Sequence, residues 1–281
     1  MPPRVYYTPE SYLKQPFKLL RDMGRDLLAS RELAWRLMIR DISAQYRQSF
    51  LGLTWAFLPP ILMAAGFTLA GQAQVFSVGA TDIPYPAYVM FGTSLWQTFT
   101  EAINGPVQAV TQAKPMLARV NFPREAIILA KVGEVFFNFA IKLILIVGLF
   151  IYFQIPVQWT VILTPVPLIH LVLLGTLAGT LLSPLGALYQ DVSKGLASLL
   201  GLWLFITPVV YPVPTEGLFG LLVRFNPVTP LLVTLRELAT SSVLTQAQEF
   251  WIVSILTWVG LFLTWVAFRI AMPYVIERVS S

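Results

Sequence analysis

The stretch LILIVGLFIYFQIPVQWTVILTPVPLIHLVLLGTLAGTLLSPLGALYQ, residues 143–190, contains no Asp, Glu, Lys or Arg. A transmembrane helix needs ~20 apolar residues to cross ~30 Å of hydrocarbon, so this stretch can hold the end of one span and the whole of a second. Of the 281 residues in the chain, 56% are hydrophobic and 12% are charged, whereas a soluble domain carries roughly 25% charged residues. The sequence therefore predicts an all-α integral membrane protein.

Further charge-free runs lie on both sides of this stretch, at residues 48–81, 195–215 and 250–268. Together with the less apolar segment that follows Asp82, they predict six transmembrane helices. We expect these spans at about Leu51–Leu69, Ala87–Val110, Ala126–Phe153, Val161–Pro184, Gly195–Tyr211 and Phe250–Ile270.

The spans divide the chain into a cytoplasmic N-terminal segment (1–50), a six-span transmembrane domain (51–271) and a cytoplasmic tail (272–281). Six is an even number, so both ends lie on the same side of the membrane. With both ends inside, the inner loops and ends carry fourteen Lys and Arg residues, and the outer loops carry two, Arg224 and Arg236. Cytoplasmic loops are enriched in Lys and Arg, so this bias predicts cytoplasmic termini.

The N-terminal segment holds nine of the 19 basic residues and no apolar core of a signal peptide, so we expect it to stay in the cytoplasm. Because its basic residues adjoin a span, membrane lipids rather than nucleic acid are the expected partner. Residues Leu33–Tyr46 predict an amphipathic helix in the headgroup layer, which either only anchors the chain or also touches a cytoplasmic partner. Its basic face holds Arg36, Arg40, Ser43 and Arg47, and its apolar stripe holds Trp35, Met38, Ile39, Ile42 and Tyr46.

Residues 212–248 are too long for a simple outer loop and too interrupted for an ordinary span. Short apolar pieces alternate there with breakers, which is typical of re-entrant half-helices that line a protected path. A loosely packed outer loop remains the alternative. The breakers are Pro212, Pro214, Gly217, Gly220, Pro227 and Pro230.

The search for enzyme chemistry in the chain mostly fails. The chain has no cysteine and one histidine, His170, which excludes thiol catalysis and a multi-histidine metal site within one chain. Gly66 and Gly71 have the spacing of a phosphate loop, but Gln72 follows where the loop requires Lys. We therefore expect no catalytic site, no metal site and no cofactor in this chain, so that any ATP-derived energy comes from another polypeptide.

A few ionisable residues fall inside the predicted spans. Lys131 and Glu134 are three positions apart, so we expect them to pair on one helix face. Lys142 lies deeper, and three placements remain open for it: against a neighbouring helix, reaching toward the interface, or facing a channel. Glu101 is similarly ambiguous. The chain lacks the series of acidic residues that a proton-driven transporter usually needs.

The connection between the second and third spans reads QAKPMLARVNFPREA, residues 112–126. Pro115 is expected to open a short helix and Pro123 to open the third span, because proline suits the first helical turn. A rigid short helix at a span boundary can receive a cytoplasmic motor. The alternative is a simple turn with basic anchors.

Four blocks of sequence, in order across about Leu33 to Ile276, resemble one known family. The chain is similar to the membrane subunit of the type-2 ABC exporters of polysaccharides, which include O-antigen and teichoic acid exporters. The blocks are RDISAQYRQSFLGLTWAFLPP (40–60), VNFPREA (120–126), LYQDVSKGLASLLGLWLFITPVVYP (188–212) and FNPVTPL (225–231). One departure is Gln190 before Asp191, where the family usually has Arg.

The resemblance implies a homodimer of this chain with two copies of an ABC ATPase subunit, which would hold ATP and Mg. It implies that a coupling loop transmits ATPase closure and that the basic entry helix, with Arg36, Arg40 and Arg47, lies at the cytoplasmic interface. By matching position, the coupling contacts fall on Lys114, Arg119, Asn121, Phe122, Pro123 and Arg124.

The resemblance also implies that spans 1 and 5 border the translocation path and that the outer segment forms re-entrant helices. Sugar rings pack their C–H faces on aromatic rings, although core packing is the alternative role for each aromatic side chain. Candidate lining residues are Trp55, Phe57, Trp203, Phe205 and Tyr211, and the re-entrant candidates are Asn226, Pro227 and Pro230.

The sequence thus favours a permease subunit that moves a lipid-linked polysaccharide, such as O-antigen, teichoic acid or a capsule-like glycan, across the cytoplasmic membrane of a bacterium. An exporter of a small lipid or drug with the same architecture is the alternative, and it would have a narrower, apolar path. An enzyme acting on lipid-linked sugars would need clustered carboxylates or a metal site, and a passive scaffold would not need the coupling block.

Overall fold

The computed structural model describes residues 16–47, 54–73, 79–119, 122–214, 216–241 and 243–280. All regular secondary structure in these ranges is helical, which confirms the expected all-α class. The elements are α2 (Pro16–Arg47), α3 (Thr54–Gln72), α4 (Tyr85–Arg119), α5 (Glu125–Tyr152), the 3-10 helix η1 (Trp159–Leu163), α6 (Pro165–Leu188), α7 (Asp191–Ile206), α8 (Gly217–Phe225), α9 (Val228–Thr240) and α10 (Ala247–Ser280).

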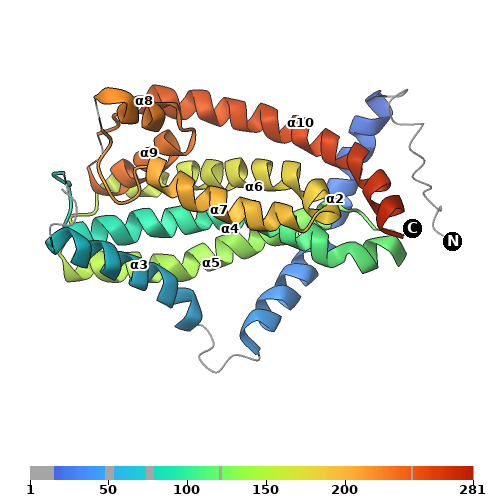
Figure 1. Ribbon diagram of the computed structural model, residues 1–281, viewed down its shortest axis with the longest axis horizontal. Helices are drawn as coiled ribbons and strands as arrows, with labels where there is room; N and C mark the ends of the chain where they lie inside the picture. Colours follow the sequence, from blue (N-terminus) through green and yellow to red (C-terminus); the bar gives the residue numbers. More distant parts are fainter. Residues whose placement is uncertain are drawn as a thin grey trace.

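The long helices α4, α5, α6 and α10 run along the long axis of the molecule (Figure 1). Helix α2 crosses one end of this bundle, near the C-terminal part of α10, and the short helices α8 and α9 lie at the opposite end. Helix α4 is central, because it contacts α3, α5, α6, α7, α9 and α10. The bundle therefore has two chemically different ends joined by α4.

Small residues let α6 pack tightly against α4. A Cβ atom placed on Gly179 would lie 2.3 Å from the carbonyl oxygen of Ile103, and one on Gly175 would lie 2.7 Å from the Cβ of Ala102. Helices in a bilayer associate through such close backbone contact, since lipid tails are as apolar as leucine. The Thr111 hydroxyl adds a hydrogen bond of 3.1 Å to the carbonyl of Gly186.

Among the residues that the structure describes, three helical segments are long and apolar enough to cross a membrane: Glu125–Tyr152, Trp159–Leu188 and Ala247–Arg278. A fourth candidate is the α8–α9 pair, which is bent by 85°. Most exposed side chains in the middle of α5 and α10 are apolar, for example Ile144 and Leu263. Large exposed apolar faces of this kind suit lipid, so the chain is a multi-pass membrane protein.

Helix α2 is longer than expected, and its buried face differs from the predicted apolar stripe. Ala34 and Leu37 pack against Ala126 and Ala130 of α5, whereas Trp35 of the stripe is 61% exposed. The chain has apolar residues on more than one side of α2, so sequence spacing alone did not reveal which side meets the bundle. Within the predicted stripe, Met38 packs against the same cluster, whereas Trp35 and Ile39 are exposed and available to the headgroup layer.

Pro115 does not open a separate short helix, which corrects that expectation. Helix α4 continues through Pro106 and Pro115 to Arg119. A proline inside a helix costs ~3 kcal/mol, but the end of α4 is held by its packing: Leu117 is buried in one cluster with residues of α10. Pro123 lies just before Arg124, the N-cap of α5, and its carbonyl accepts a hydrogen bond of 3.2 Å from the backbone N–H of Ala126.

Candidate functional site

Only part of the predicted coupling segment lies within the described residues. Phe122 is half-buried and packs against the cluster that contains Leu117 and Phe268, while Pro123 and Arg124 are also half-buried. Lys114 is half-buried near the end of α4. Arg119 ends α4 without a described side chain, and Asn121 lies outside the described residues. We refer to residues 122–124, the described residues directly before α5, as the α4–α5 turn.

A buried charge cluster lies directly behind this turn. Arg269 of α10 donates hydrogen bonds to Asp26 of α2 at 2.5 Å and to Glu125 of α5 at 3.0 Å. Trp265 donates a third, at 3.3 Å, to the same Glu125 carboxylate. All three charged side chains are nearly inaccessible to solvent. The cluster therefore connects α2, α5 and α10 next to the α4–α5 turn.

Sequence reasoning missed this cluster, although it placed Arg269 at the edge of a span. Asp26 lies 243 positions away from Arg269, and Glu125 lies 144 away. Neither separation follows from helical spacing. The available signal was chemical: buried charges are paired, so charges at the edges of different spans are expected to find one another.

A second polar contact joins the other half of α2 to α5. Asp41 accepts hydrogen bonds from Arg40, and Lys131 lies 3.1 Å from Asp41 and 2.6 Å from Glu134. The predicted Lys131–Glu134 pair is thereby confirmed. Partial burial alone would raise the pKa of Asp41, but the hydrogen bonds from Arg40 and Lys131 outweigh it and hold the pKa below its ordinary value.

The predicted basic face of α2 is on the surface. Arg36 pairs with Glu32 at 2.5 Å, and both side chains are well exposed. Arg40 and Arg47 are exposed as well. These side chains are accessible to an acidic surface or to lipid headgroups, and their interface role stays a prediction.

The opposite end of the bundle is organised around Asn226, which is buried between α7, α8 and α9. Its side-chain oxygen accepts from the Trp203 indole at 3.0 Å and from the backbone N–H of Val228 at 3.1 Å. Its side-chain amide donates to the Thr207 hydroxyl at 2.8 Å. Pro227 caps α9, and Pro230 is buried in the first turn of α9. The break between α8 and α9 is thus satisfied by protein groups, as broken backbone at membrane depth requires.

Arg236 of α9 fixes the same end of the bundle to α4 and α7. It donates to the carbonyls of Pro208 and Val209, both at 3.2 Å. Its guanidinium carbon lies 3.8 Å from the centre of the Tyr88 ring, a distance typical of a cation–π contact. The bent pair is therefore an ordered part of the bundle, and the loosely packed loop considered above does not describe it.

The candidate lining residues differ in their burial and fall into three sets. Trp203 lies in an aromatic core and makes edge contacts with Trp96 and Phe99. Trp55 and Phe205 are exposed at 52% and 62%. The other two, Phe57 and Tyr211, are half-buried. Core packing accounts for Trp203, and a lining role for the rest stays a prediction.

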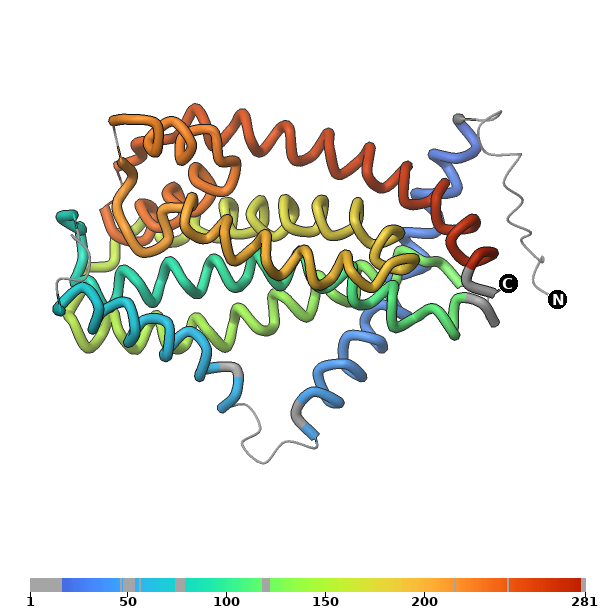
Figure 2. Tube along the Cα trace, viewed as in Figure 1, coloured from blue at the N-terminus to red at the C-terminus, as the bar shows by residue number. Residues whose placement is uncertain are grey.

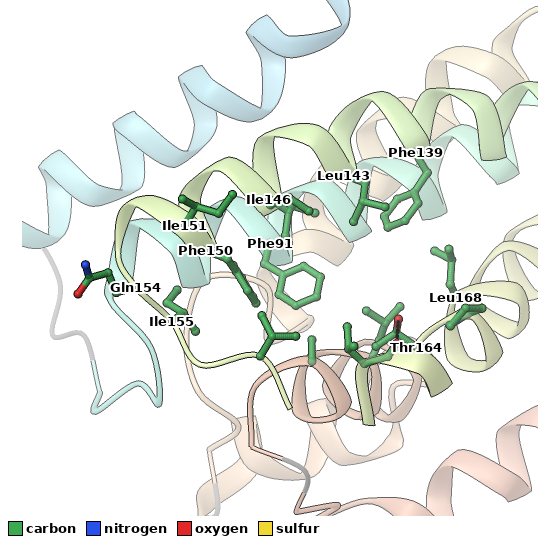
Figure 3. Close-up of a pocket in the computed structure, with 16 residues that line it drawn as sticks. Phe91, Phe139, Leu143, Ile146, Phe150, Ile151, Gln154, Ile155, Thr164 and Leu168 are labelled. Atoms are coloured by element: carbon green, nitrogen blue, oxygen red, sulfur yellow. Dashed lines mark hydrogen bonds between the residues drawn. The ribbon is translucent and has the colours of Figure 1, made fainter. Parts of the chain in front are cut away.

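An apolar cavity of about 490 Å³ lies between α5, α6, η1 and α9. Phe91, Phe139 and Phe150 line it, and Gln154 lies at its edge (Figure 3). Its lining contains no charged residue. A glycan needs hydrogen-bonding partners for its hydroxyls, so the chemistry of this cavity suits hydrocarbon rather than sugar.

The open question about Lys142 is resolved by its neighbours. Lys142 of α5 is 3% exposed and lies 2.6 Å from the carboxylate of Glu101 on α4. Asn138, one turn earlier on α5, donates to the other oxygen of Glu101 at 3.2 Å. Lys142 thus lies against a neighbouring helix, which was one of the three placements left open.

Comparison with known proteins decides the family. The profile described as ABC-2 type transporter matches residues 32–239, more than half of the chain. The chain belongs to this family. The O-antigen export system permease protein RfbA of Myxococcus xanthus is 32% identical over 215 residues, which cover 74% of this chain and 80% of the relative. The resemblance inferred from the four sequence blocks is thereby confirmed.

This ABC-2 type transporter chain is therefore a transport permease. The match to the family includes the α4–α5 turn, α7 and the α8–α9 pair, but Asp26 and Arg269 lie outside it. The buried charge cluster thus ties the family segment, through Glu125, to the two flanking helices.

Proposed function

We propose that this chain is the membrane subunit of an ATP-driven exporter that moves a lipid-linked polysaccharide across the cytoplasmic membrane of a bacterium. The observation that carries the proposal is the 32% identity, over most of both chains, to a protein named as an O-antigen export permease. O-antigen, teichoic acid and capsule-like glycans belong to the same substrate class. The order of the four sequence blocks supports the same assignment.

The proposed topology has six spans with both termini in the cytoplasm and α8–α9 as a re-entrant pair. Helix α4 has 35 residues, about 52 Å at 1.5 Å per residue, which is more than the hydrocarbon thickness. Helices α3 and α7 have 19 and 16 residues, which is short for a span and needs local thinning or close protein neighbours. The excess of Lys and Arg on one side sets the direction.

The functional unit in this proposal is two copies of the chain with two copies of an ABC ATPase, which holds ATP and Mg. The α4–α5 turn would receive the ATPase. Phe122 is anchored against α10, and the Glu125–Arg269–Asp26 cluster adjoins the turn. A displacement of the α4–α5 turn by the ATPase would therefore be transmitted to α2, α5 and α10 together.

The test is deletion of the gene in its own bacterium, followed by measurement of surface glycan and of lipid-linked glycan held inside. We expect surface glycan to fall and internal lipid-linked glycan to accumulate, with both restored by the wild-type chain. Normal surface glycan together with increased sensitivity to a drug, or an altered lipid distribution, would instead support the small-molecule exporter.

A further inference from the structure

Helix α4 is central to the bundle and yet is not among the helices apolar enough to span a membrane by composition. Its amide and acidic side chains between residues 97 and 112 contribute to this, and these side chains fall on one face. Spaced by four, three, four and four positions, they follow a single helical row. The row, which we call the α4 polar stripe, consists of Gln97, Glu101, Asn104, Gln108 and Gln112.

Internal packing does not account for this stripe. Gln108 and Gln112 are exposed, Asn104 is half-buried, and the Glu101 side chain is 34% exposed. Within the described part of the chain, the side chains of Asn104, Gln108 and Gln112 make no hydrogen bond. Three amides are therefore left with free donors and acceptors.

The stripe is open because α3 covers only one half of α4. Ala64 and Phe67 of α3 pack near Val89 and Met90 of α4, and Gln97 donates to the Met63 sulfur at 3.5 Å. From there the Thr54 end of α3 leans away from the long helices (Figure 2). Within the described residues, no contact of α3 with Asn104 or Gln108 closes this half of the stripe, and Gln112 at its end lies in a small polar pocket beside Arg40 and Asp41 of α2.

The exposed faces of α5 and α10 have the opposite chemistry. The outward faces of α5 and α10 present side chains such as Ile144, Ile151 and Ile255. Those faces suit hydrocarbon, whereas a row of amides and a carboxylate at membrane depth needs water or a polar partner. The α4 polar stripe therefore does not face lipid.

The negative charge of Glu101 on the stripe is balanced by Lys142 of the neighbouring helix α5. Lys142 pairs with Glu101, so the stripe presents a neutral polar surface rather than an anionic one. Side-chain amides both donate and accept hydrogen bonds. Such a surface matches the many hydroxyls of an uncharged or weakly charged sugar chain and holds none of them strongly.

We propose that the α4 polar stripe lines the translocation path, with Asn104, Gln108 and Gln112 exchanging hydrogen bonds with the hydroxyls of the glycan as it passes. Lys142 is a positioning residue that keeps Glu101 paired. The identity of the substrate rests on the proposed function, whereas the access of water to the stripe does not. These two parts are tested separately.

The chain has no cysteine, so each engineered cysteine is the sole thiol in the permease. Asn104→Cys and Gln108→Cys, in the full complex, are treated with a charged, water-soluble thiol reagent in both right-side-out and inverted membrane vesicles. The matched controls are Ile144→Cys and Ile255→Cys, whose parent side chains are exposed on lipid-facing helices. We expect the two stripe positions to react at least tenfold faster than the controls in one vesicle orientation.

Equal reaction rates at stripe and control positions would overturn the proposal. So would unreactive stripe cysteines that cross-link to the second copy of the chain, because the stripe would then be a dimer contact. Fast labelling in a complex that exports a different class of substrate would leave the path assignment standing and remove the polysaccharide assignment. Gln108→Leu tests the glycan contact directly: we expect a several-fold lower export rate with the wild-type amount of bound ATPase, and an unchanged rate would overturn that contact.

Discussion

Arg269 of α10 donates a 3.0 Å hydrogen bond to Glu125, the first residue of α5 after the α4–α5 turn. The same guanidinium holds Asp26 of α2, so one side chain connects three helices at the site proposed to receive the ATPase. A buried ion pair contributes little net stability when intact, but loss of one partner leaves an uncompensated buried charge. The cluster is therefore expected to respond strongly to single substitutions.

Arg269→Ala is expected to destabilise the permease by about 3–5 kcal/mol, because it removes the closest cation from two buried carboxylates, Asp26 and Glu125. The measurement is thermal unfolding in a mild detergent. Arg36→Ala is the matched control, since Arg36 makes an exposed ion pair with Glu32, and it should change stability very little. Equal effects of the two substitutions would show that the buried cluster does not contribute to the stability of the fold.

Gly179→Ala is expected to disrupt the contact between α4 and α6. The added Cβ would lie 2.3 Å from the backbone carbonyl oxygen of Ile103. Because the clashing atom belongs to the backbone, no side-chain movement can relieve the clash. Gly148→Ala is the control, because a Cβ there meets nothing within 4 Å; it should be neutral or slightly stabilising. Purified yield and melting temperature are the readouts, and equal values for the two variants would contradict the packing described.

Lys142→Met should lower stability, because the Glu101 carboxylate loses its cation at membrane depth. Adding Glu101→Gln to the same chain should recover much of the loss, because no unpaired charge remains. A double-mutant cycle measures the recovery. Purely additive losses would show that the two groups do not interact in the folded protein.

Asn226→Leu is expected to detach the α8–α9 pair from α7. Asn226 joins Trp203, Thr207 and Val228 through three hydrogen bonds, and each lost bond leaves a buried donor or acceptor that costs about 1–3 kcal/mol. Proteolysis in the segment around residues 212–216 should become faster. Trp203→Phe removes one of these bonds and should have a smaller effect, so an equal effect of the two would argue against Asn226 as the organising residue.

Local spacing predicted some features of the fold and site, and long-range packing decided the others. The Lys131–Glu134 pair follows from residues three apart on one helix, and the membrane class follows from the charge-free runs. The partner of Lys142 needed the packing of α4 on α5, and the partners of Arg269 lie on helices far away in sequence. Pro115 was misread as a helix start because its local preference is outweighed by the burial of Leu117 against α10.

The polar stripe of α4 was in the sequence throughout, but only the structure shows which parts of it remain uncovered. In the sequence alone, Glu101 is a single charge of ambiguous placement, and the spacing of the amides on the same face assigns them no role. Spacing alone does not reveal exposure, because a row of amides can equally well be buried against a neighbouring polar helix. The divergence of α3 from α4 supplies the missing information.

The most direct test of the central claim is to purify the tagged permease in mild detergent from its native cells and quantify the proteins that accompany it. We predict one ABC ATPase per permease copy. Phe122→Ala combined with Arg124→Glu should remove the ATPase, whereas Trp159→Ala, at the opposite end and 74% exposed, should retain it. A permease that purifies without a nucleotide-binding protein in several mild detergents, or a turn variant that keeps its ATPase, would contradict the claim.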